Sequence, residues 1–186
     1  ETESFTIKVV TPEEFQKSLE ERSADEVTEQ PKDMVSAMRD LAERQQKLAE
    51  EMERLQKELA KNPGNAEAQR KLANAREEQK ALQQEAKELA KSMDELARSP
   101  STSALERAMK EALGKMAEAL AKAANGSMAS ACQGTPGASA AAAKEASRTL
   151  QTLQRRMDEQ IQKSLDNLEK VYPLFNDVDR FMALLD

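Results

Sequence analysis

The sequence contains no histidine and no tryptophan, and only one cysteine, one tyrosine and four phenylalanines among 186 residues. Without histidine, the Glu-x-x-His di-iron pattern, histidine-based zinc sites and the common catalytic triads are excluded. The single cysteine, Cys132, excludes a disulfide within the chain. We therefore predict a non-enzymatic protein with no catalytic residues, no cofactor and no metal site.

Other kinds of segment are also missing. No stretch approaches the roughly 18 apolar residues of a membrane span, and no signal peptide opens the chain. The net charge of −6 comes from interspersed acidic and basic residues, so no basic stripe is available for phosphates. We expect neither nucleic acid binding nor direct membrane insertion. The chain starts without Met and stops within an apolar pattern, so we expect it to be part of a longer protein of unknown compartment.

What the sequence does contain is charged residues, at 33%, and two long heptad patterns. Aromatic residues are only 3% of the chain, so leucine, alanine and methionine must form the core. The first pattern opens at Pro31, and its seam is Met34, Met38, Leu41, Gln45, Leu48, Met52, Leu55 and Leu59. The second seam is Ala68, Leu72, Ala75, Gln79, Leu82, Ala86, Leu89, Met93 and Leu96.

Between the two patterns lies a well-defined turn, Asn62-Pro63-Gly64-Asn65. Proline ends the first helix, and asparagine can cap the second. Folding the helices antiparallel about this turn brings the two polar seam residues, Gln45 and Gln79, into adjacent layers. We predict that they hydrogen-bond across the seam and favour this register over a slipped one.

Shorter elements flank the hairpin. Residues 5–10 alternate apolar and polar side chains as a strand does, and a short helix with Phe15 and Leu19 follows. A third helix ends at Asn125-Gly126, and a flexible loop spans residues 126–139. A fourth helix starts near Ser139, and Pro173 breaks or kinks it. The third seam is Leu105, Met109, Leu113, Met116 and Leu120, and the fourth is Ala146, Leu150, Leu153, Met157, Ile161, Leu165, Leu168 and Val171.

We therefore predict an all-α protein, with an antiparallel coiled-coil hairpin within an elongated helical bundle and a short N-terminal β-strand-like segment. Residues 1–30 form the strand and short helix, 31–99 the hairpin, 100–172 the third and fourth helices, and 173–186 an apolar tail. The seams occupy only a and d positions, which favours a projecting hairpin over a complete four-helix bundle.

Two features of the second half are candidates for function. The tail is more aromatic than the rest, and we expect it to dock on a protein partner or on the remainder of its own longer chain; otherwise it caps the bundle. Its interaction residues are Leu174, Phe175, Phe181, Met182 and Leu185. Cys132 is either an incidental free cysteine, which we favour because no histidine can activate it, or a reactive or crosslinking thiol.

The start of the chain carries a resemblance to a known kind of protein. The segment Phe5-Thr6-Ile7-Lys8-Val9-Val10-Thr11-Pro12-Glu13-Glu14-Phe15, followed by Arg22 and a coiled coil rich in Gln and Glu, resembles the strand-to-coiled-coil junction of large membrane-anchored bacterial envelope proteins of unknown function. The resemblance implies a periplasmic or cell-envelope location and a non-enzymatic segment. It assigns no functional residue.

The leading functional hypothesis is a structural or protein-interaction module, a spacer or docking arm within a larger bacterial envelope protein. A holdase-type chaperone or adaptor is an alternative, but it would need exposed apolar residues at the hairpin tip, which here is the polar segment 61–65. A helical insert of a larger enzyme is a third possibility. The same heptads also allow two chains to pair as a homodimer.

Overall fold

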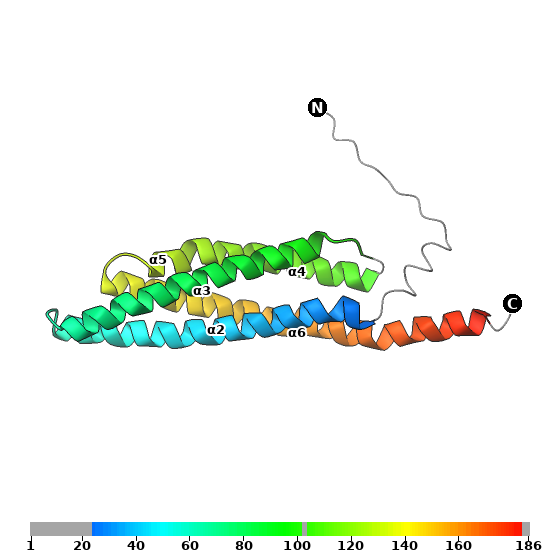
Figure 1. Ribbon diagram of the computed structural model, residues 1–186, viewed down its shortest axis with the longest axis horizontal. Helices are drawn as coiled ribbons and strands as arrows, with labels where there is room; N and C mark the ends of the chain where they lie inside the picture. The colour runs from blue at the N-terminus through cyan, green and yellow to red at the C-terminus, as the bar shows by residue number, and fades with distance from the viewer. Residues whose placement is uncertain (1–23, 102–103, 184–186) are drawn as a thin grey trace, which may run out of the picture.

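The computed structural model describes residues 24–101 and 104–183 (Figure 1). Within these residues the protein is an all-α four-helix bundle without a strand. Its long helices are α2 (Ala24–Lys61), α3 (Ala66–Arg98), α4 (Ala104–Ala123) and α6 (Pro136–Ala183). A π-helical turn, η1 (Ala124–Met128), and the short α5 (Ala129–Ala131) extend α4. The predicted strand and short helix before residue 23 lie outside the described residues.

The α2–α3 turn has the predicted form. The Asn65 side chain caps α3 by accepting hydrogen bonds from the backbone N–H groups of Glu67 and Ala68, each at 3.1 Å. These are two of the donors that have no partner inside a helix. The Gln69 side chain also donates to the carbonyl of Pro63 at 2.8 Å, which closes the turn from the other side.

The predicted seams form the core. Every seam residue whose side chain is described is buried, apart from four that are partly buried: Met34, Leu89, Leu96 and Leu105. The seam side chains of α6 are described as far as Leu165. The heptad pattern therefore identified most of the core, because burial of a helix face repeats at the helical period.

The projecting hairpin, by contrast, was a wrong prediction. The most extensive contact of α2 is with α6, and that of α3 is with α4 (Figure 1). Beside its seam, α2 buries a further column at seven-residue spacing, Val35, Ala42 and Ala49. This third column widens the apolar stripe enough to face two neighbours, which makes α2 part of a bundle.

Small residues set how closely the paired helices approach. A Cβ atom placed on Gly114 of α4 would lie 3.4 Å from the Cβ of Ala97 in α3, which is already van der Waals contact and shows how close the two helices are. On the α2–α6 side, Ala143 and Ser147 of α6 are buried. Alanine, glycine and serine at these positions let the backbones come near each other.

The start of α2 differs from the prediction. The helix begins at Ala24 and continues through Pro31, which was expected to open it. Proline removes one backbone donor and crowds the preceding turn, but the hydrogen bonds on either side can still be made. Pro31 is itself buried, and this packing offsets part of the lost bond.

Three expected features of the second half also change. Asn125-Gly126 does not end the third helix, because η1 and then α5 continue the helical chain as far as Ala131. The loop predicted over 126–139 is therefore only residues 132–135, and α6 begins at Pro136. Gly134, with φ of +90°, makes the reversal. At its other end α6 continues past residue 173, where a break or kink was expected.

Candidate functional site

The polar centre of the bundle is a reciprocal pair of glutamines. Gln45 of α2 donates to Oε1 of Gln79 in α3, and Gln79 donates back to Oε1 of Gln45, both at 2.8 Å. Both side chains are fully buried. Gln45 also reaches the carbonyl of Ala143 in α6 at 3.5 Å. The predicted hydrogen bond across the seam is confirmed, and it aligns three helices at one level.

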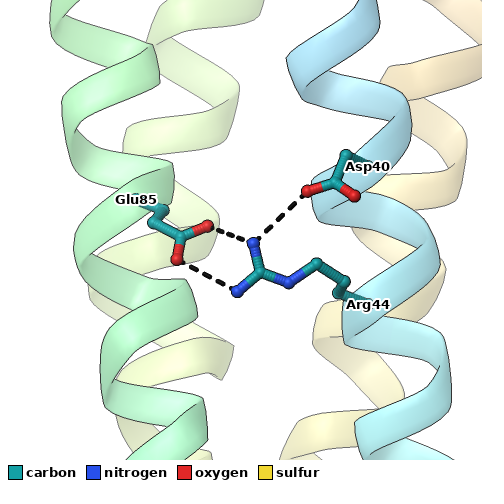
Figure 2. Close-up of polar contacts among 3 residues, drawn as sticks. All are labelled: Asp40, Arg44 and Glu85. Carbon is teal, nitrogen blue, oxygen red and sulfur yellow. Dashed lines mark hydrogen bonds and ion pairs between the residues drawn. The ribbon is translucent and has the colours of Figure 1, made fainter.

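A second contact aligns α2 with α3 at the surface. Figure 2 shows the Arg44 guanidinium against both oxygens of Glu85, at 2.6 and 3.0 Å, with Asp40 one turn away at 3.3 Å. The hydrogen bond to Glu85 raises the pKa of Arg44, which favours its charged form. Since these side chains are about 40% exposed, the contact contributes at most about 1 kcal/mol. Its main effect is on the register.

Three contacts align α2 with α6 in the same way. Arg39 bonds Asp158 at 2.7 Å, Gln151 donates to Gln46 at 2.9 Å, and Lys144 bonds Glu53 at 3.1 Å. In each pair the two residue numbers add up to 197, which is the antiparallel register of the two helices. This register places Ala24, the start of α2, opposite Pro173 of α6.

The residues of α6 after 173 therefore extend beyond the start of α2. The backbone of α6 is helical to Ala183, and Figure 1 shows its end passing that of α2. Four of the five predicted interaction residues, Leu174, Phe175, Phe181 and Met182, belong to this segment. Their side chains and residue Leu185 lie outside what the structure describes. We call residues 174–183 the α6 extension.

No protein-family model, curated protein or solved structure matches this chain. The bundle itself therefore has to supply the evidence for function. Across residues 24–101 and 104–183, none of the helices has the length and apolar character of a membrane span. In the same residues, no cluster of three or more ligating side chains could hold a metal ion.

Cys132 lies at the end of α5, where the chain leaves the helix. Its thiol is buried and lies 3.3 Å from the carbonyl of Met128. Burial raises the pKa of the thiol above its ordinary value of 9.0, although nearby Lys80 acts in the opposite direction. Because the thiolate is the reactive form, this environment favours an inert cysteine.

Sequence reasoning missed a buried ion pair at the start of α4. Lys110 and Glu106 are 4% and 1% exposed, and their charged atoms lie 2.6 Å apart. Lys110 also donates to the carbonyl of Pro100 at 2.5 Å, which ties α4 to the segment that follows α3. The sequence did carry a signal for this pair. Glu106 lies seven residues before the seam residue Leu113, so both side chains fall on the same face of the helix. We assign the pair a structural role, because Lys110 also donates to the backbone carbonyls of Ser99 and Pro100 beside it.

Proposed function

We propose that this chain is a structural and protein-interaction module without enzymatic activity, a rigid spacer with a docking end, within a larger bacterial envelope protein. The observation that carries the proposal is the α6 extension, which continues past the start of α2 in the register of the α2–α6 contacts. A helix of 48 residues is about 70 Å long, which suits a spacer.

The sequence of the extension supports docking. Residues 174, 178 and 181 are Leu, Val and Phe at steps of four and three, the spacing of one helix face. Such a face is the usual anchor when one helix binds to another helix or groove. The rigid part of the molecule supports the same proposal, because polar and charged contacts tie α2 to both α3 and α6.

The other two functions have less support. A holdase would grip its client through apolar residues at the hairpin tip, and the exposed residues there are Lys61, Asn62, Pro63 and Gly64. If the chain were a helical insert of a larger enzyme, the catalytic residues would lie outside it. The absence of histidine weighs against catalysis by the chain itself. The envelope context rests on the resemblance of residues 5–15.

Site-specific photo-crosslinking in the native cells tests the docking end. A photoreactive residue at position 178 should give one discrete crosslinked species, whether a partner, a second copy or the rest of the longer chain. The matched control is position 155, an exposed residue of α6 beside the bundle, which should give none. The double substitution Phe175→Glu and Phe181→Glu should abolish the crosslink. Equal crosslinking at 155 and 178, or a crosslink that survives the double substitution, would contradict the proposal.

A further inference from the structure

A cavity of about 500 Å³ opens at the end of the bundle that carries the α2–α3 turn. Its walls come from three segments that are distant in sequence: Gln56 and Leu59 of α2, Leu72 and Arg76 of α3, and Gly134 with Gly137 around the start of α6. The volume lies within the range of small-molecule sites, about 300–1,000 Å³. Among the described residues that line it, Arg76 alone carries a charge.

The cavity exists because the fourth helical segment of the bundle, formed by α4, η1 and α5, ends before it reaches the α2–α3 turn. The helical chain α4–η1–α5 ends at Ala131, and the 132–135 loop crosses α3 at the level of Arg76. The first ten residues of α3 lie between that level and the α2–α3 turn. Over this stretch the fourth position of the bundle holds no helix in the described part of the chain.

Among the described residues, two neutral groups hold Arg76 in place. Its Nη2 donates to the carbonyl of Gly134 at 2.6 Å and to Oγ of Ser139 at 3.0 Å. Its Nε is buried and has no acceptor among the residues that the structure describes. None of its contacts in the described residues is a carboxylate, unlike those of Arg44 (Figure 2). A partly buried guanidinium with an unused donor and no counter-ion is unusual enough to require an explanation.

We propose that this cavity binds a small organic acid, with Arg76 as the counter-ion of its carboxylate and with Leu59 and Leu72 beneath its apolar part. Two neutral hydrogen bonds fix the guanidinium before the ligand arrives, which lowers the entropic cost of binding. The first turn of α6 borders the same space, and the positive end of its dipole adds to the preference for an anion.

The test is a titration of the isotopically labelled full chain with 3-phenylpropionate, followed by backbone amide shifts in NMR spectra. The acid should cause saturable shifts around Leu72, Gly134 and Gly137. The neutral amide of the same compound should bind at least about tenfold more weakly, because it cannot make the charge-assisted hydrogen bond to Arg76. Equal binding of acid and amide, or no saturable shift, would overturn the proposal.

Variants locate the site. Arg76→Gln should reduce the affinity for the acid to that for the amide, whereas Arg70→Gln, an exposed arginine of the same helix, should leave it unchanged. Arg76→Gln also removes a bond to the 132–135 loop, so a second variant keeps the arginine and fills the cavity instead. A Cβ atom placed on Gly137 would lie 3.8 Å from Nε2 of Gln56, an ordinary contact, so the longer side chain of Gly137→Leu extends into the cavity that Gly137 lines. This variant should lose binding of both compounds. Binding of the acid at the wild-type affinity in Arg76→Gln, or retained binding in Gly137→Leu, would overturn the proposal.

Discussion

The amides of Gln45 and Gln79 satisfy each other inside an otherwise apolar seam, so neither can be replaced alone without a cost. A buried amide that loses its partner keeps its desolvation penalty, about 1–3 kcal/mol. Removing both amides avoids this penalty, because two leucines of similar size bring no polar group into the core. The pair therefore selects the arrangement of the helices more than it adds to stability.

We expect Gln45→Leu alone to lower the free energy of unfolding by about 1–3 kcal/mol, and the double substitution with Gln79→Leu to recover most of that loss or exceed it. Urea denaturation of the two single variants and the double variant measures this. Crosslinking between positions 52 and 75 then reports the register. If the double variant keeps one sharp register identical to the wild type, the glutamines do not select it.

Glu53 has a lowered pKa, about 2, because Lys57 and then Lys144 donate to its carboxylate. The ordinary value is 4.5, so the folded state favours the ionised form. Its contribution to stability is complete above about pH 4.5 and is lost as the pH falls toward 2. We expect the stability difference between wild type and Glu53→Gln to shrink over that window.

An NMR titration of the Glu53 carboxyl group measures the pKa directly. In Lys144→Ala the pKa should rise toward 4.5, because one of its two donors is gone. An unchanged pKa in that variant would show that Lys57 alone is responsible, and the α2–α6 contact would then contribute nothing to the charge of Glu53.

Among the elements, η1 is the π-helical turn that continues α4 where the sequence favours the end of a helix. Asn125 and Gly126 favour the end of a helix, yet the chain remains helical through a π turn. The wider turn disturbs the backbone bonding of an α-helix, and Gln83 of α3 donates to the carbonyl of Ala124 at 2.9 Å. A side chain on a neighbouring helix thus supports the local irregularity.

We expect Gln83→Leu to destabilise the protein by about 1 kcal/mol and to speed amide hydrogen exchange in residues 124–131. The matched control is Gln84→Leu. Its wild-type side chain is exposed and, in the described part of the chain, bonds only Glu88 on the same helix, so the change should have little effect. Equal exchange in the two variants would mean that Gln83 does not support η1.

Considered as a whole, the molecule is longer than a globule of the same size. A compact chain of 186 residues has a radius of gyration of about 16 Å. A rod as long as α6, about 70 Å, has one of about 20 Å or more. The long axis follows from the register of α2 and α6, which are offset at the end where the α6 extension begins.

Small-angle scattering with light scattering on the same sample checks the shape and the oligomeric state. We expect a radius of gyration of about 20 Å or more, and a monomer, because the heptad seams are already buried within the bundle. A value near 16 Å would contradict the long α6. A dimer would indicate that a surface outside the seams, such as the α6 extension, pairs two copies.

Features that depend on neighbours along the chain could be predicted from the residues alone. The seams, the Asn65 cap and the turn follow from spacings of a few residues, and the Gln45–Gln79 contact follows from folding two seams about that turn. The five interaction residues were likewise chosen from a local pattern, and they remain a prediction.

Features that depend on several helices at once could be seen only in the folded bundle. The tight pairing of α2 with α6 comes from an alanine-containing column beside the seam, whose role is evident only when a partner is present. The passage of α2 through Pro31, the π turn and the cavity beside Arg76 have the same origin, because packing from other segments outweighs or completes a local preference. The spacing of apolar residues predicts which face of a helix will be buried. What covers that face depends on the assembled bundle.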